Sequence, residues 1–339
     1  MRWWRLIIEA GLNKRWSDET RGSHLSQSDL AEIVDFYLSD FQVDKLQANV
    51  SSAALRQSVT DELFLVFSTE LGSNAEDLLT KLNSKANQYL RVNTNILTRA
   101  ELQTRLSIEG IDTDLVPNVD SALKLRERKN VFTTKAYQDG CFEMQDAGSQ
   151  MIAPFLEPQF KDRVVDACAG AGGKTLHLAD LMKNQGRILA LDIHEKKLDE
   201  LKKRARRSKT SSIETRPIVS SKVIKRLEDS ADRLLLDVPC TGLGVLRRHP
   251  DTKWKFRAKD LANIYLSQSE ILESYTKMLH KGGVGVYATC SVLPSENESQ
   301  VHDFIERSQG RFELEKELNV SPLTSDFDGF FAARFRRIR

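Results

Sequence analysis

Two cysteines each follow an apolar segment that has the composition of a buried strand. Cys240 ends a Pro-Cys pair after RLLLD (233–237), and Cys290 ends a Thr-Cys pair after GVGVYA (283–288). If both segments are parallel strands of an open α/β sheet, both thiols lie at carboxyl ends of strands, where such sheets bind ligands. A thiolate is a nucleophile, and a second group nearby can transfer a proton. The pair therefore predicts covalent catalysis at this edge of a sheet.

Methylation at carbon 5 of a pyrimidine is a reaction that needs both functions. That carbon is unreactive until a thiolate adds to carbon 6, and a base must later remove the carbon-5 proton. Asp237 supports this interpretation, because its carboxylate can pair with the N3 and N4 edge of cytosine. A methyltransferase directed at an amino group is expected to carry an aromatic residue where this chain has Cys240. Cys141 and Cys168 have no comparable surroundings, and we interpret them as small packing residues.

A glycine-rich loop, DACAGAGGKT (166–175), lies between an apolar segment and a predicted helix. A Walker A loop would need glycine at Cys168, and a dinucleotide fingerprint would need glycine at Thr175. The remaining form, an acidic strand end before a short glycine-rich loop, favours S-adenosylmethionine, which needs no phosphate cradle. Asp192 ends the next predicted strand, where a carboxylate can accept hydrogen bonds from both ribose hydroxyls.

The elements that must position these residues alternate between strand and helix signals, which favours a parallel sheet in an α/β fold. The predicted strands are 163–167, 187–192, 215–219, 233–237, 283–290 and 329–339, and the predicted helices are 174–183, 195–208 and 259–279.

The first part of the chain has a different pattern. Apolar residues at helical spacing, among them Leu30, Ile33, Leu63 and Phe67, predict a helical region over residues 1–85, beginning with a helix at MRWWRLIIEAGL. Residues 86–148 predict a small α+β subdomain that has a strand from Tyr89, a helix over 99–109 capped by Thr98, and further short strands. Residues 149–339 form the third predicted domain.

Composition excludes several classes of protein. The chain has 339 residues, 40% hydrophobic and 29% charged, with no apolar run of the ~20 residues that span a bilayer. Its four cysteines form no C-x-x-C pair, and its histidines are scattered. We therefore expect a cytoplasmic protein with reduced thiols, without a metal site and without membrane association.

The formal net charge is only +2, but basic residues are clustered. The cluster that we favour for RNA follows the Cys240 loop and includes an aromatic residue for stacking on a base. Its predicted RNA-binding residues are Arg247, Arg248, Lys253, Trp254 and Lys255. A second basic run, at residues 196–209, is equally consistent with a solvated helix face.

Four segments in this order resemble the RsmB/NOP/Sun family of RNA (cytosine-5) methyltransferases: DACAGAGGKTLHLA, LALDIHEKKL, DRLLLDVPCTGLGVLRRHPDTKW and YATCSVLPSENE. The resemblance covers residues 88–339. DNA cytosine methyltransferases also have a Pro-Cys pair, in which the cysteine is the nucleophile, and the Thr-Cys pair at Cys290 is what favours the RNA family. The resemblance implies that Cys290 attacks the base, that Cys240 assists release, and that Lys174 and Asp237 orient the base.

The resemblance also implies a Rossmann-like class I methyltransferase fold with a mostly parallel sheet, preceded by a small α+β RNA-binding subdomain and an N-terminal helical region. It favours ribosomal RNA as the partner, and we expect a monomer. The chain departs from the family at Ala171, where proline is usual and where we expect a looser loop. It also lacks an evident acidic adenine-binding residue, and we assign that contact to Ser220 or its neighbour Ser221, with Ser220 preferred. We expect the N-terminal helical region to be a shortened form of the family's NusB-like domain.

The residues predicted to bind S-adenosylmethionine are Asp166, Ala167, Cys168, Ala169, Gly170, Ala171, Gly172, Gly173, Lys174, Asp192, Ser220 and Asp237.

Two other classes of function remain open at this point. One is a P-loop-like nucleotidase, against which the missing glycine at Cys168 argues. The other is a non-catalytic RNA-binding or ribosome-assembly protein that retains the methyltransferase fold. The presence of both thiols favours the enzyme over this second alternative.

Overall fold

The computed structural model describes residues 52–339, so the helices predicted at residues 1–12 and around Leu30–Leu38 lie outside the described residues. Residues 52–83 and 250–258 belong to one compact unit, and residues 84–249 and 259–339 form another. Among the helices described, none has the length and apolar character needed to cross a membrane. The domain boundaries predicted at residues 85 and 148 stay predictions.

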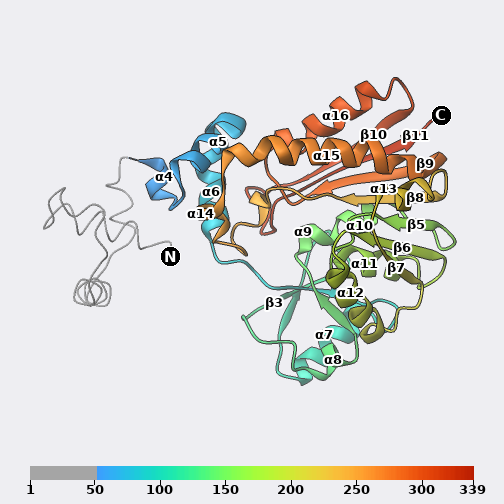
Figure 1. Ribbon diagram of the computed structural model, residues 1–339. Helices are drawn as coiled ribbons and strands as arrows, with labels where there is room; N and C mark the ends of the chain where they lie inside the picture. The colour runs from blue at the N-terminus through green and yellow to red at the C-terminus, as the bar shows by residue number, and fades with distance from the viewer. Residues whose placement is uncertain (1–51) are drawn as a thin grey trace, which may run out of the picture. The chain divides into compact units, whose positions relative to one another are not determined.

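The first unit is helical (Figure 1). Its helices are α4 (Ala53–Arg56), α5 (Asp61–Leu71), α6 (Ala75–Asn83) and α14 (Thr252–Lys255). Helix α5 begins where the Thr60 hydroxyl accepts a hydrogen bond from the Leu63 amide, which satisfies a free donor of the first turn. Leu63 and Phe67 are four residues apart on this helix and both are fully buried, as their helical spacing predicts.

The second unit begins with a four-stranded antiparallel sheet in the order β2-β3-β1-β4. Its strands are β1 (Tyr89–Val92), β2 (Thr113–Leu115), β3 (Ala122–Leu125) and β4 (Phe142–Met144), and its helices are α7 (Arg99–Ile108) and α8 (Lys135–Gln138). Thr98 and Glu101 form a capping box at the start of α7, which confirms the helix predicted after Thr98. This is the small α+β subdomain.

A seven-stranded sheet carries the predicted site. Its order is β10-β11-β9-β8-β5-β6-β7, and β11 runs in the direction opposite to the other six strands. The strands are β5 (Arg163–Asp166), β6 (Arg187–Asp192), β7 (Ile213–Pro217), β8 (Ala231–Asp237), β9 (Leu279–Thr289), β10 (Phe312–Val320) and β11 (Phe330–Arg337). The predicted Rossmann-like class I methyltransferase fold is confirmed.

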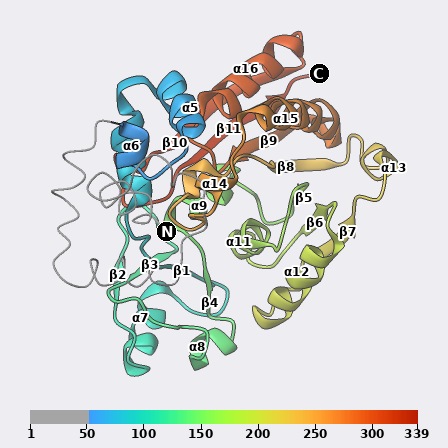
Figure 2. The ribbon, with the colours of Figure 1, turned by 60° about the vertical axis from the view of Figure 1, so that its left-hand side comes forward.

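Helices cover both faces of this sheet (Figure 2). One face packs against α10 (Ile152–Phe155), α11 (Gly173–Leu181) and α12 (Glu195–Arg207), and the other against α13 (Ser221–Lys225), α15 (Leu261–Tyr275) and α16 (Glu298–Arg307). Leu234 and Leu236 lie in the core of one face and Leu235 in the core of the other. Both faces of strand β8 are buried, which explains the continuous apolar run by which this strand was predicted.

Some elements differ from the sequence predictions. Strand β7 begins at Ile213 rather than Thr215, and α15 ends at Tyr275 rather than Leu279. Helix α16 and strand β10 were not predicted. Strand β10 is an edge strand whose central side chains are mostly exposed and charged, so it lacks the apolar signature of the buried strands.

Buried charges join the small sheet to the helices that follow the glycine-rich loop. Glu143 of β4 is buried and pairs with Arg204 (3.0 Å) and Arg207 of α12. Arg91 of β1 is also buried and donates to the backbone carbonyl of Gly173 at the start of α11. These contacts give Arg204 and Arg207, which belong to the second basic run, a structural role.

Candidate active site

The two cysteines singled out by the sequence meet at the carboxyl edge of the seven-stranded sheet. Strands β8 and β9 are parallel neighbours with Asp237 opposite Ala288, so the loops that follow them start side by side. The Sγ atoms of Cys240 and Cys290 are 3.4 Å apart, within hydrogen-bonding distance for sulfur. That hydrogen bond with Cys290, together with burial, raises the pKa of the Cys240 thiol well above its usual value.

A half-buried ion pair lies at the same edge. Lys174, in the first turn of α11, places its ammonium group 2.7 Å from a carboxylate oxygen of Asp237 at the end of β8. Burial disfavours the charge on Lys174, but Asp237 outweighs this effect and raises the pKa of the ammonium group. Cys290 also acts on this ammonium group electrostatically. The site therefore holds a cation that can stabilise a thiolate. It also holds a carboxylate that can accept a hydrogen bond from a nucleobase.

Asp166 is almost fully buried at the end of β5. One oxygen accepts a hydrogen bond from the Thr175 hydroxyl at 2.7 Å; the other makes no well-formed hydrogen bond among the described residues, although the backbone amide of Cys168 lies near enough to favour the charged carboxylate. Burial raises the pKa of Asp166 to about 7. Because a buried polar atom without a partner is rare, the free oxygen fits a ligand that brings a hydrogen-bond donor, such as the ammonium group of the predicted cofactor.

The glycine-rich loop leaves open space above it. A Cβ atom on Gly170 or Gly173 would meet nothing within 4 Å, so a ligand can approach both backbones, whereas one on Gly172 would lie 2.5 Å from the Leu201 side chain of α12. Gly170 and Gly172 have positive φ angles, which favour glycine. Ala171, where we expected a looser loop, accepts a hydrogen bond from Arg204 at 2.7 Å through its carbonyl oxygen. The remaining predicted loop residues, Ala167, Cys168 and Ala169, follow β5 directly.

Asp192 lies where the sequence predicts it, at the end of β6 beside the glycine-rich loop. Its two oxygens accept hydrogen bonds from the backbone amides of Gly170 (2.9 Å) and His194 (2.7 Å). Each oxygen keeps a further lone pair for a ligand such as a ribose hydroxyl.

The predicted adenine contact, Ser220, is exposed after the end of the neighbouring strand β7. Sequence reasoning missed two apolar residues next to these strand ends. Ile193 follows Asp192 and is 64% exposed, and Val219 precedes Ser220 and is 81% exposed. Isolated exposed apolar residues need no special explanation, but here the ends of two adjacent strands present them together.

The matches with known proteins agree with this geometry. A family model described as 16S rRNA methyltransferase RsmB/F matches residues 153–336, and a model described as an RsmF/B-like ferredoxin-like domain matches residues 66–132. This chain belongs to the RsmB/F family. A probable ribosomal RNA small subunit methyltransferase B of Bacillus subtilis is 34% identical over 267 residues, which cover 74% of this chain and 60% of that relative.

The RsmB/F match extends to other relatives and to solved structures. Ribosomal RNA small subunit methyltransferase B of Vibrio cholerae is 35% identical over 260 residues, covering 74% of this chain and 59% of that protein. The structure of a methyltransferase homologue from Pyrococcus horikoshii superposes with a TM-score of 0.75 at 26% identity, covering 84% of this chain and 98% of that one. The chain spans about three fifths of the length of these curated relatives.

The residues that we predicted to bind RNA have structural contacts in this RsmB/F chain. Arg247 and Arg248 both pair with Asp328, which is fully buried, and Arg248 also pairs with Asp146 at 2.7 Å. Within the helical unit, Lys253 is buried and donates to Asn83, and Lys255 pairs with Asp251 one turn away. Trp254 is half-buried on the same helix, α14. The RNA contacts of these five residues stay a prediction.

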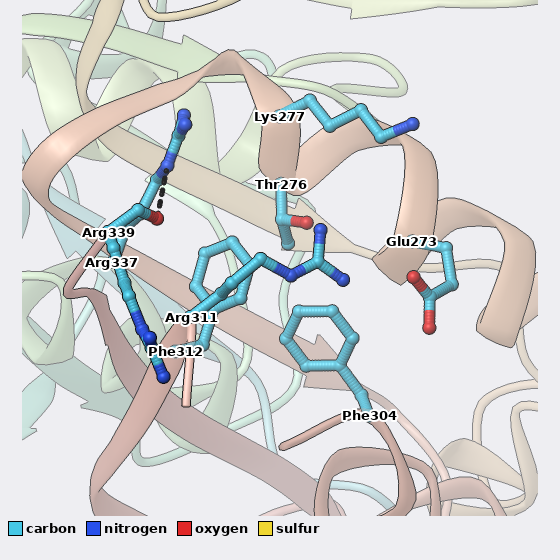
Figure 3. Close-up of a pocket in the computed structure, with 8 residues that line it drawn as sticks. All are labelled: Glu273, Thr276, Lys277, Phe304, Arg311, Phe312, Arg337 and Arg339. Carbon is cyan, nitrogen blue, oxygen red and sulfur yellow. Dashed lines mark hydrogen bonds between the residues drawn. The ribbon is translucent and has the colours of Figure 1, made fainter. Parts of the chain in front are cut away.

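A pocket of about 50 Å³ lies at the opposite, amino edge of the sheet (Figure 3). Basic side chains line it, and its three arginines already have partners. Arg311 donates to the carbonyl of Ser308, and Arg339 donates to those of Gln309 and Gly310, just beyond the end of α16. Arg337 pairs with Asp229. Two of these arginines donate to carbonyls of the turn that follows α16, and the third pairs with a carboxylate, which is a sufficient structural reason for the cluster. Across residues 52–339, no group of His, Cys, Asp and Glu side chains could hold a metal ion.

Proposed function

We propose that this chain methylates carbon 5 of a cytosine in ribosomal RNA, using S-adenosylmethionine, through a covalent adduct of Cys290 that Cys240 resolves. The observation that carries the proposal is the 3.4 Å separation of the two sulfur atoms beside the ion pair of Lys174 and Asp237. The names of the relatives support ribosomal RNA of the small subunit as the substrate.

The residues around the glycine-rich loop are the proposed cofactor site. Asp166 takes the ammonium group with its free oxygen, Asp192 accepts from the ribose, and Ile193, Val219 and Ser220 contact the adenine. S-adenosylmethionine, when bound, supplies the methyl group that carbon 5 of the base receives.

The target cytosine must leave its base stack to reach the two thiols. Asp237 accepts a hydrogen bond from the amino group of the base, and Lys174 remains beside it to donate to the ring edge and to stabilise negative charge. The thiolate of Cys290 then adds to carbon 6 and forms the carbon–sulfur bond. The electron pair of the carbon 5–carbon 6 double bond moves onto carbon 5 and makes that atom nucleophilic.

After methylation the carbon-5 proton must leave. The pKa of Cys240 is raised first of all by its hydrogen bond with Cys290, and bond formation between Cys290 and the base removes that cause. Cys240 then loses its proton to solvent more readily, and its thiolate removes the proton from carbon 5. The double bond re-forms and the carbon–sulfur bond breaks, which returns Cys290 as a thiolate.

The test is transfer of radiolabelled methyl from S-adenosylmethionine to an unmodified small-subunit rRNA transcript, followed by nucleoside analysis. We expect label in 5-methylcytidine, and a loss of at least about 1,000-fold with Cys290→Ala because the substitution removes the proposed nucleophile. Cys141→Ala is the matched control, since Cys141 is a buried thiol of the small sheet. Label in another nucleoside, or full activity of Cys290→Ala, would contradict the proposal. No label on RNA with cofactor binding intact would favour a non-catalytic RNA-binding protein.

A further inference from the structure

A buried carboxyl group joins the two loops that carry the thiols. Glu296 is fully buried in the turn after the Cys290 loop. Its Oε1 atom accepts hydrogen bonds from the backbone amide of Thr241 (2.8 Å) and from the side chain of Gln268 (3.0 Å). Its Oε2 atom accepts from the hydroxyl groups of Thr241 and Ser291. Thr241 directly follows Cys240 and Ser291 directly follows Cys290, so one carboxyl group contacts the neighbour of each thiol.

Backbone hydrogen bonds from Val238 and Gly244 join the two loops independently of Glu296, but the residues that directly flank Cys240 depend on this carboxyl group more than those that flank Cys290. On the far side of Cys240, the carbonyl of Pro239 accepts from the amide of Gln268 at 3.0 Å, and Glu296 accepts from the same amide. Glu296 therefore holds the residues on both sides of Cys240, one directly and one through Gln268.

The Cys290 loop has a second, independent support. The side chain of Asn297 accepts from the Thr289 hydroxyl (2.5 Å) and donates to the backbone carbonyl of Ser291 (3.2 Å). These two contacts enclose Cys290 without involving Glu296. Loss of the Glu296 carboxyl group should therefore displace Cys240 more than Cys290.

We infer that Glu296 is a positioning residue that keeps Cys240 within reach of Cys290, and that its loss impairs release of the adduct more than its formation. This inference rests on the proposed function for the roles of the two thiols. Glu296 makes no hydrogen bond to either sulfur among the described contacts; it positions the thiols through Thr241, Ser291 and Gln268, while its charge also acts on Cys240 directly.

Two substitutions separate the hydrogen bonds of Glu296 from its acidity. In Glu296→Gln, the amide oxygen can accept from the Thr241 amide and from Gln268, and the amide nitrogen can donate to the two hydroxyl groups, which turn to accept. In Glu296→Ala, all four contacts are lost. Glu298→Gln is the matched control, because Glu298 is a neighbouring carboxylate that contacts Asn319 instead of either thiol loop.

The first arm of the experiment needs no RNA. Diamide oxidises two nearby thiols to a disulfide and is itself reduced to the hydrazine, and peptide mapping follows the Cys240–Cys290 crosslink over time. We expect Glu296→Ala to slow this crosslink by about tenfold or more, because small displacements of reacting groups have large effects on rate. Glu296→Gln should stay within about threefold of the wild type, and Glu298→Gln should be unchanged.

The second arm uses the small-subunit rRNA transcript with S-adenosylmethionine. We expect Glu296→Ala to lose turnover while it accumulates a denaturant-stable protein–RNA adduct, as Cys240→Ala should. A role in folding alone would instead lower adduct formation and turnover together. If Glu296→Ala melts below the assay temperature, Gln268→Met tests the same link with a milder change, and a slowed crosslink is again expected.

A crosslink at the wild-type rate in the folded Ala or Met variant would overturn the inference, as would turnover lost without adduct. If the wild type itself formed neither 5-methylcytidine nor adduct, the proposed function would be wrong, and the diamide arm would still decide whether Glu296 positions the thiols.

Discussion

The two edges of the seven-stranded sheet both carry clustered charges, but those charges have different surroundings. At the carboxyl edge, Asp166 is buried with a free oxygen, and Lys174 and Asp237 pair beside two thiols. At the amino edge, Arg311 and Arg339 donate to backbone carbonyls beyond α16. Charged side chains whose hydrogen-bonding groups already have protein partners are structural, whereas those that keep unused hydrogen-bonding capacity are candidates for binding a ligand. The two edges therefore differ in whether their polar groups already have hydrogen-bond partners, rather than in charge.

The largest difference in activity is expected between substitutions of two lysines near opposite ends of helix α11. Lys174 lies in the first turn of α11 at the carboxyl edge, and Lys183 follows the helix at the amino edge, over the ring of Phe160. We expect Lys174→Met to lower kcat by about 100-fold or more, because it removes a preorganised cation at the reacting base. Lys183→Met should change kcat less than about twofold, as an exposed substitution away from the site. Equal effects in methyl-transfer kinetics would break the comparison of the two edges.

Asp192 tests the cofactor half of the carboxyl edge. Asp192→Ala removes the acceptor for the Gly170 and His194 amides as well as the proposed ribose contact. We expect the Kd for S-adenosylmethionine to rise by about 10- to 100-fold, in line with the loss of one to two charge-assisted hydrogen bonds. Isothermal titration calorimetry measures this change. Asp162→Ala, at the amino edge before β5, is the control, and an equal loss of affinity there would contradict the assignment.

The pH dependence of stability should have opposite signs at the two edges. Burial raises the pKa of Asp166 to about 7, against an ordinary value near 3.8. Its contribution to the unfolding free energy of the cofactor-free protein is therefore fully present below about pH 4. This contribution is lost as the pH rises through 7, by roughly 4 kcal/mol at most. Hydrogen bonds from Arg334 and Lys316 lower the pKa of Glu157, before β5, to about 2. Its contribution is present above about pH 4.5 and is lost as the pH falls towards 2.

Urea unfolding between pH 4 and 8 checks the first of these signs. The unfolding free energy of the wild type should fall relative to that of Asp166→Asn as the pH rises to 7, and the difference should then level off. Glu157→Gln should show no such trend over this range. A difference for Asp166→Asn that is independent of pH would mean that Asp166 ionises normally in the folded protein.

The smallest effect is expected in the amino-edge pocket. Arg339→Ala removes exposed hydrogen bonds to the carbonyls of Gln309 and Gly310. We expect a loss of at most about 1 kcal/mol in unfolding free energy and unchanged methyl transfer, because exposed interactions with a helix end are weak. Thermal melting and the RNA assay check both parts, and a clear loss of methyl transfer would assign the pocket a role that its contacts do not suggest.

The buried strands and the functional residues directly after them could be predicted from the sequence. Continuous apolar runs located β5, β6 and β8, and the residues after β8 and β9 located the thiol pair. Strand β10 could not be found in this way, because an exposed edge strand has no apolar pattern.

The partners of charged side chains were also beyond the sequence. From the sequence alone, Arg247 and Arg248 are predicted to bind RNA. Both pair with Asp328, which lies some 80 positions further along the chain. Glu296 likewise contacts Thr241 across 55 positions. Local patterns identify which residue types are present, whereas only the fold determines which of them meet.

The most direct test of the central claim is to identify which sulfur bonds to the base. An rRNA transcript containing 5-fluorocytidine should trap the adduct, because fluorine at carbon 5 cannot leave as a proton does. Proteolysis and mass spectrometry of the trapped protein should then locate the nucleotide on the peptide that contains Cys290. An adduct on Cys240, or one that persists in Cys290→Ala, would contradict the account.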